Sequence, residues 1–280
     1  MIGMDGEIPD DRIASARSLY DDALYIQAAR ALEEFGHPRD WKGAGARIFG
    51  ARLSQNLGAH RQAVRLFAAA YRSGDPDAES MLYRAYQLMA QRGPLAAWSF
   101  LRDLDPPGQP EISASIYALR GKICAHFKDR RGMAAQFGLA FASAPDSAWI
   151  HTEHSSALEL IDELAAAQSE ARKALALQGR FRPAVQQLAH LLLSANEDAE
   201  ALALLEDAAS RMESGAILQQ WIIALSERGE NLRIPALCER AGQLLIWADA
   251  GTKSWLSARR ADAFRGAGDF ARAAAEAARC

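Results

Sequence analysis

Residues 121–147, GKICAHFKDRRGMAAQFGLAFASAPDS, contain one complete helix–turn–helix pattern. A polar turn at residues 129–131 separates two stretches with helical apolar periodicity. On the second stretch, Met133, Phe137 and Ala140 are spaced by four and then three residues, which places them on one stripe of a helix. The segment therefore predicts a helical hairpin in which this stripe packs against the first helix.

The same stripe recurs along the chain at a fixed period. The first members of seven such triplets are separated by 34, 36, 34, 34, 36 and 36 residues. Twelve residues before each first member lies a residue, small in most cases, at which two antiparallel helices can approach closely. A fixed period of this length indicates a stack of repeated hairpins. The triplets are Ala63/Phe67/Ala70, Ala97/Leu101/Leu104, Met133/Phe137/Ala140, Ala167/Ala171/Ala174, Ala201/Leu205/Ala208, Leu237/Ala241/Leu244 and Ala273/Ala277/Cys280.

The composition excludes several protein classes. The chain has 280 residues, of which 50% are hydrophobic and 24% charged, so it is too apolar to be disordered. No sustained alternation of Val, Ile and Thr indicates strands. No apolar run is long enough for a membrane helix, and the first residues carry acids instead of the basic residues of a signal peptide. We therefore expect a soluble, cytoplasmic, all-α protein without membrane insertion.

Charge and cysteine content narrow the partners further. The net charge is -3 and the basic residues are dispersed, which argues against nucleic acid as a partner. Cys124, Cys238 and Cys280 are far apart and form no CxxC motif, so they predict packed thiols in a reducing compartment. No Gly-rich phosphate loop or nucleophile elbow occurs. We expect no cofactor and no catalytic residue.

These patterns predict an α-solenoid, a right-handed superhelix of about seven repeats. Residues 1–9 are expected to be disordered, residues 10–40 to form an amino-terminal helical cap, and residues 41–280 to form the solenoid. A degenerate extra repeat is the alternative for the cap. The predicted repeats span residues 44–77, 78–113, 114–147, 148–181, 182–217, 218–253 and 254–280, the last one truncated.

The hairpin of residues 121–147 resembles the tetratricopeptide repeat family. Gly121, Phe137, Ala140 and Pro145 stand at the spacing characteristic of that family. The resemblance covers roughly residues 43–280 and implies a scaffold fold; it says little about function.

Three segments also resemble, more weakly, the repeat region of bacterial proteins in which a papain-like, double-glycine-leader-type cysteine peptidase domain follows the repeats. These segments are residues 37–59, 92–102 and 179–192. The catalytic Cys and His of such proteins lie in the downstream domain, and we find no such domain within these 280 residues, because those after Arg260 indicate another repeat. Because Cys280 falls inside an expected second helix, we expect the chain to be a fragment.

One histidine pair is a candidate for metal chemistry. His151 and His154 are three residues apart and would share a helix face. No third ligand follows at a helpful spacing, and the repeat register directs both rings toward the partner helix. Hydrogen-bonded packing is therefore the favoured interpretation, and a metal-dependent enzyme is the third and least favoured hypothesis for function.

The first helices of stacked hairpins line a concave face, which is where we expect a partner to bind. The leading hypothesis is a non-catalytic scaffold that binds a protein or peptide segment, with flat aromatic anchors and cationic side chains as the main contacts. The alternative is a structural module that self-associates into a homo-oligomer. The predicted binding residues are Arg52, Gln55, Tyr86, Lys122, His126, Trp149, Gln186 and His190.

Overall fold

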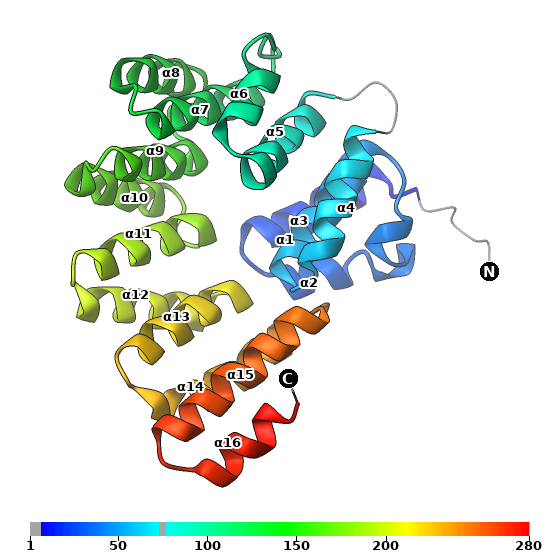
Figure 1. Ribbon diagram of the computed structural model, residues 1–280. Coiled ribbons are helices and arrows are strands. Elements are labelled where there is room, and N and C mark those ends of the chain that lie inside the picture. Colours follow the sequence, from blue (N-terminus) through cyan, green and yellow to red (C-terminus); the bar gives the residue numbers. More distant parts are fainter. Residues whose placement is uncertain (1–6, 73–76, 280) are drawn as a thin grey trace. The chain divides into compact units, whose positions relative to one another are not determined.

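The computed structural model describes residues 7–72 and 77–279, which are helical and contain no strand (Figure 1). Most of the predicted disordered segment, residues 73–76 of the first predicted repeat and Cys280 lie outside this range. The helices are α1 (Asp10–Asp21), α2 (Tyr25–Arg30), α3 (Ala44–Asn56), α4 (His60–Tyr71), α5 (Ala78–Arg92), α6 (Pro94–Leu101), α7 (Pro110–His126), α8 (Arg130–Ser143), α9 (Ala148–Leu160), α10 (Leu164–Leu177), α11 (Arg182–Ser194), α12 (Asp198–Arg211), α13 (Gly215–Glu227), α14 (Ile234–Leu244), α15 (Ala250–Gly266) and α16 (Phe270–Ala277), with short 3-10 helices η1 (Glu33–Phe35), η2 (Pro38–Asp40) and η3 (Asn231–Arg233).

Three first helices begin earlier than the predicted repeat boundaries. Helices α7, α13 and α15 begin at residues 110, 215 and 250, whereas the repeats were predicted to begin at residues 114, 218 and 254. Local chemistry explains these starts. Pro110 occupies the first turn of α7, where its missing N–H is tolerated. Ser214 and Asp249 are N-caps whose side chains accept hydrogen bonds from the N–H groups of residues 217 and 252 at 3.3 and 2.9 Å.

The described chain divides into two compact units. Unit 1 comprises the residues up to Lys42, Phe49–Arg65 and the residues from Glu197 onward. Unit 2 comprises Gly43–Ile48 and Leu66–Asn196. Unit 1 therefore contains early and late parts of the chain, whereas most of unit 2 is one continuous stretch.

Unit 2 is a two-layer stack of hairpins. The pairs α5–α6, α7–α8 and α9–α10 form the hairpins, and the first helices α5, α7, α9 and α11 contact one another in that order (Figure 1). Small residues make the close crossings possible, as predicted. A Cβ atom on Gly121 of α7 would lie 2.7 Å from the Phe137 ring of α8, so only glycine fits this crossing. Phe137 is 2% exposed and Ala140 is fully buried.

Unit 1 contains the carboxy-terminal hairpins and the amino-terminal segment. Helices α12 to α16 contact one another in chain order, and α1 packs on α2. Within residues 10–40, α1 and α2 are followed by the short turns η1 and η2. Trp41 closes this segment: its indole is buried, it donates to the Gly36 carbonyl at 3.2 Å, and a Cβ on Gly50 would lie 3.1 Å from its ring.

Candidate functional site

Three of the predicted binding residues meet on the first helices of unit 2. Tyr86 comes from α5, Lys122 from α7 and Trp149 from α9. The Tyr86 and Trp149 rings lie 5.9 Å apart in an edge-to-face arrangement, although their helices are two hairpins apart. Residues of three consecutive repeats therefore form one cluster.

Glu153 is a fourth member of this cluster, and the sequence analysis missed it. Glu153 lies on α9, is only 5% exposed, and its carboxylate oxygens are 3.5 and 3.4 Å from the Lys122 ammonium nitrogen. A carboxylate four residues after Trp149 on one helix shares its face, and this spacing was the available signal. We call Tyr86, Lys122, Trp149 and Glu153 the first-helix cluster.

Two polar atoms of the first-helix cluster are buried without a hydrogen-bond partner of good geometry. These atoms are the Tyr86 hydroxyl oxygen and Glu153 Oε2. Burial raises the pKa of the Tyr86 hydroxyl well above its usual value; the negative charge of Glu153 adds to this, and the Trp149 indole partly opposes it. Tyr86 is therefore a neutral O–H donor at physiological pH, beside an acceptor that Lys122 holds only loosely.

One other predicted binding residue, His126, lies near Lys122. Partial burial and the charge of Lys122 lower the pKa of His126 below its usual value, which disfavours its charged form. The Phe181 ring, just before α11, lies 6.3 Å from Trp149. Gln186 of α11 accepts a hydrogen bond from Arg182 at 2.5 Å, and no observed contact joins it to the cluster.

Three further predicted residues are not brought to this cluster by any observed contact. His190 of α11 pairs with Glu159 at 2.8 Å. Arg52 and Gln55 belong to unit 1, where the Arg52 guanidinium lies over the Tyr20 ring at 4.4 Å and Gln55 is exposed.

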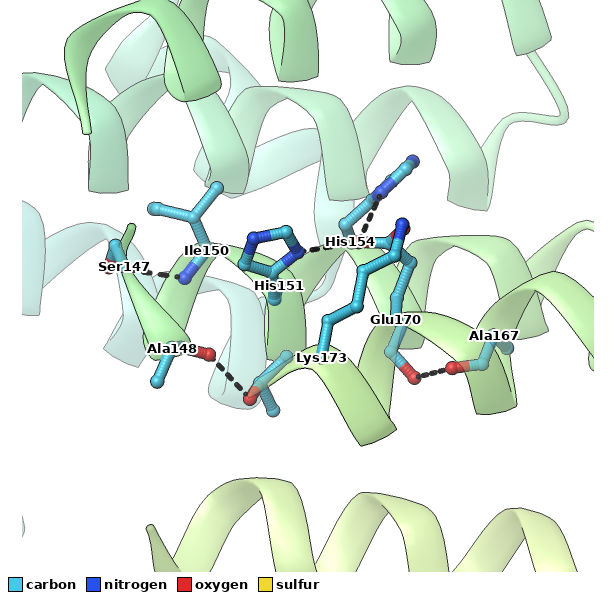
Figure 2. A network of polar contacts seen from close by, with 10 residues as sticks. Ser147, Ala148, Ile150, His151, His154, Ala167, Glu170 and Lys173 are labelled. Carbon is cyan, nitrogen blue, oxygen red and sulfur yellow. Dashed lines mark hydrogen bonds and ion pairs between the residues drawn. The ribbon is translucent and has the colours of Figure 1, made fainter. Parts of the chain in front are cut away.

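His151 and His154 point from α9 toward a shared carboxylate on α10 (Figure 2). Glu170 Oε2 lies 2.7 Å from His151 Nδ1 and 3.4 Å from His154 Nδ1, and Lys173 donates to Glu170 Oε1 at 2.7 Å. Burial alone would raise the pKa of Glu170, but hydrogen bonds from His154, Lys173 and His151 outweigh it and hold the pKa far below its usual value. Both histidines therefore pack against the ionised Glu170 carboxylate and interact with it.

The histidine pair also joins neighbouring repeats. The His154 ring lies 4.5 Å from the Phe137 ring of α8, and the His151 ring lies 4.9 Å from the Phe141 ring. No group of three or more His, Cys, Asp or Glu side chains in residues 7–72 and 77–279 is arranged to hold a metal ion. Hydrogen-bonded packing, the favoured interpretation from the sequence, accounts for both rings.

The two described cysteines are not activated nucleophiles. Burial raises the pKa of Cys238 to about 12, with nearby Arg260 and Arg259 opposing it only in part. Burial and the charge of Asp129 raise the pKa of Cys124 as well. Both thiols are therefore protonated at neutral pH, as expected for packed side chains.

None of the helices in the described part of the chain is both long and apolar enough to span a membrane. This finding agrees with the absence of long apolar runs in the sequence.

Comparison with known proteins identifies the fold. No known family and no curated protein matches the sequence. Among solved structures, PilW, a widely conserved type IV pilus biogenesis factor, is 14% identical, with a TM-score of 0.51 over 71% of this chain and 90% of its own. A tetratricopeptide repeat protein from Parabacteroides merdae is 12% identical, with a TM-score of 0.51 over 91% and 98%.

The human IFIT1 dimer with PPP-AAAA is 11% identical, with a TM-score of 0.55 over 97% of this chain and 72% of its own. At these identities the likenesses concern the fold. Together with the stacked hairpins and their small crossing residues, they show that this chain has the fold of a tetratricopeptide-repeat protein.

Proposed function

We propose that this chain is a non-catalytic scaffold that binds a peptide segment of a partner protein at the first-helix cluster of unit 2. One observation carries the proposal: Tyr86 Oη and Glu153 Oε2 are buried without a hydrogen bond of good geometry, and the Lys122 ammonium nitrogen lies 3.4 Å from Oε2. Leaving a buried polar atom without a partner costs about 1–3 kcal/mol, so folded proteins keep few such atoms. The presence of two such atoms in one cluster would be explained if a bound ligand supplied their hydrogen-bond partners.

The chemistry of the cluster favours an extended peptide. A peptide unit offers one N–H donor and one C=O acceptor, which match Glu153 Oε2 and the Tyr86 hydroxyl respectively. Lys122 supplies a further donor to a carbonyl or carboxylate. The Trp149 and Phe181 rings lie next to these polar groups and would pack against the apolar side chains of the peptide.

The fold supports a scaffold role. Repeated hairpins build extended surfaces without an internal catalytic pocket, and the histidines and thiols described above are engaged in packing. The sequence adds three further expectations to this proposal. They are a place beside a peptidase domain, a cytoplasmic location and, as an alternative role, self-association.

The test begins with peptides selected from a random library on the full chain. We expect Glu153→Gln and Tyr86→Phe each to weaken the Kd of the selected peptides by about tenfold, the range of a binding hot spot. Glu163→Gln is the matched control, because Glu163 lies in an exposed ion pair with Arg130 away from the cluster. Isothermal titration calorimetry provides the affinities.

Two outcomes would sink the proposal: selected peptides whose affinity is the same for all three variants, or failure to select any peptide with the folded chain. Light scattering on the same preparation tests the self-association alternative. A concentration-dependent dimer that Glu153→Gln abolishes would show that the cluster binds a second copy instead.

A further inference from the structure

The Glu153 carboxylate of the first-helix cluster is held more loosely than buried carboxylates usually are. Glu153 is 5% exposed, yet the Lys122 ammonium nitrogen lies 3.5 and 3.4 Å from its two oxygens. Charge-assisted N–H···O contacts are normally about 2.7–2.9 Å long. In the neighbouring helix α10, Lys173 reaches Glu170 at 2.7 Å, so a lysine of this chain can approach a carboxylate closely. Lys122 therefore balances the charge of Glu153 without a close contact.

Lys122 reaches solvent, whereas Glu153 is almost fully covered. The Lys122 side chain is 24% exposed and that of Glu153 is 6% exposed. A lysine can keep its methylene stem packed while its charged end turns into water. A cation brought by a ligand can therefore replace Lys122 at the carboxylate. Lys122 then becomes the donor that the proposed function assigns to a carbonyl or carboxylate of the peptide.

Aromatic rings lie beside this pair of charges. The Tyr86 and Trp149 rings are 5.9 Å apart, the Trp149 and Phe181 rings are 6.3 Å apart, and the interplanar angles are 75° and 89°. All three side chains are partly exposed. Rings at such angles cover one another with an edge and not with a whole face, and aromatic faces attract cations. A buried carboxylate beside such rings is a combination that suits an organic cation.

We propose that the first-helix cluster recognises an arginine side chain of the bound peptide, an inference that rests on the proposed function. The guanidinium replaces Lys122 at Glu153 and donates to both carboxylate oxygens. A guanidinium is flat and carries five N–H donors, so it can bind a carboxylate in a bidentate manner and stack on a ring at the same time. Trp149 lies four residues before Glu153 on α9, which places its indole on the same helix face as the carboxylate.

Other side chains of a peptide fit the cluster less well. A carboxylate would attract Lys122 but would also face the buried charge of Glu153. An apolar side chain would cover Glu153 Oε2, which already lacks a hydrogen bond of good geometry, and would offer it no donor. A lysine would bring the charge without the flat, forked donor set of arginine. The chemistry of the cluster therefore favours arginine.

The first test uses three small probes: N-acetylarginine amide, N-acetyllysine amide and N-acetylcitrulline amide. Citrulline has nearly the shape of arginine but no charge. Each probe is titrated into the full chain with isotope-labelled tryptophan, and the NMR signal of the Trp149 indole, identified with Trp149→Phe, reports on the cluster. We expect the arginine probe to shift this signal, the lysine probe to bind about threefold more weakly, and the citrulline probe to bind about tenfold more weakly or less.

Two substitutions in the cluster should act in opposite directions. Glu153→Gln removes the charge that the guanidinium binds, so the arginine probe should bind about tenfold more weakly. Lys122→Gln keeps a donor beside Glu153 but removes the competing positive charge, so the same probe should bind about threefold more tightly. Glu163→Gln and Lys128→Gln are the matched controls, because both side chains lie in exposed ion pairs elsewhere in unit 2, and they should leave the affinity unchanged.

The peptides selected on the full chain extend this test. They should contain arginine, and its replacement by citrulline should weaken their Kd by about tenfold. The citrulline comparison requires no substitution in the chain, so it decides the question even if a variant does not fold. Circular dichroism verifies the fold of each variant.

Three results would overturn the inference: selected peptides without arginine, no effect of citrulline, or weaker binding of the arginine probe to Lys122→Gln. In the last case Lys122 would hold the ligand instead of competing with its cation. If Glu153→Gln still weakened the selected peptides, the proposed function would stand without the arginine inference. Failure to select any peptide would refute the proposed function, whereas binding of the arginine probe that depends on Glu153 would still show the cation site.

Discussion

Two faces of helix α9 bury polar side chains in opposite ways. Toward α8 and α10, His151 and His154 share the Glu170 carboxylate, which Lys173 also reaches. Toward α5 and α7, the buried Glu153 carboxylate is held loosely by Lys122, whose ammonium nitrogen lies 3.5 and 3.4 Å from its two oxygens. Buried polar groups held by several close partners specify packing, whereas the loosely held carboxylate is where the proposed function places a ligand.

The electrostatics of the two faces show the same contrast. Three donors hold the pKa of Glu170 far below its usual value despite burial. On the other face, burial dominates, and it raises the pKa of the Tyr86 hydroxyl. A helix of this repeat can therefore join two hairpins with one face and present a binding cluster with the other.

The largest effect should come from the apolar support of the histidine face. Phe137 fills the space left by Gly121 and packs on the His154 ring. Phe137→Ala should lower the free energy of unfolding by about 3–5 kcal/mol, the usual cost of removing a buried aromatic ring. Phe127→Ala is the control, because Phe127 is 54% exposed, and its loss should stay within about 0.5 kcal/mol. Urea denaturation measures both; equal losses would contradict the assigned core.

A smaller effect should follow from Glu170→Gln, which removes the charge that both histidines and Lys173 share. We expect a loss of about 1–3 kcal/mol at pH 7. Because the folded pKa of Glu170 is lowered, its contribution is complete above its unfolded pKa of about 4.3 and is lost as the pH falls from there toward the folded value. The difference between the unmodified chain and Glu170→Gln should therefore shrink below about pH 4.

Urea denaturation at pH 7, 5 and 3.5 measures this difference. Glu163→Gln, which breaks an exposed ion pair, should cost at most about 1 kcal/mol. A Glu170→Gln loss that stays constant down to pH 3.5 would show that the charge of Glu170 does not stabilise the joint.

The smallest effect on stability should come from the opposite face. Tyr86→Phe removes a buried hydroxyl that has no hydrogen bond of good geometry, so the free energy of unfolding should change by less than about 0.5 kcal/mol or rise slightly. The same change should weaken peptide binding, which separates the binding face from the packing face. A clear loss of stability, seen by urea denaturation, would mean that the hydroxyl is bonded within the folded chain.

Several features of the fold could be predicted because they depend on neighbours in one hairpin. The spacing of Gly121, Phe137 and Ala140 predicted a close helix crossing, and the structure shows it. The facing of His151 and His154 toward the partner helix was also predicted and is confirmed. Three first helices begin three or four residues before the approximate repeat boundaries, because caps and an initial proline act outside the repeat spacing.

The candidate site was predictable only in part. Tyr86, Lys122 and Trp149 follow from the first-helix register, and the structure places them on neighbouring helices. Glu153 and Glu170 were missed because periodicity assigns a face to a residue without saying which polar groups will meet there. That pairing depends on side chains from two or three helices at once.

The chain by itself thus determined a stack of helical hairpins, because small and apolar residues at a fixed period leave few other ways to bury them. Tertiary structure decided which buried charges are held by several close donors, as at Glu170, and which are held loosely by one, as at Glu153. It also decided that Glu213 and Gly58 join segments from early and late in the sequence. Local spacing carries no information about such contacts, because they form only after the hairpins have packed.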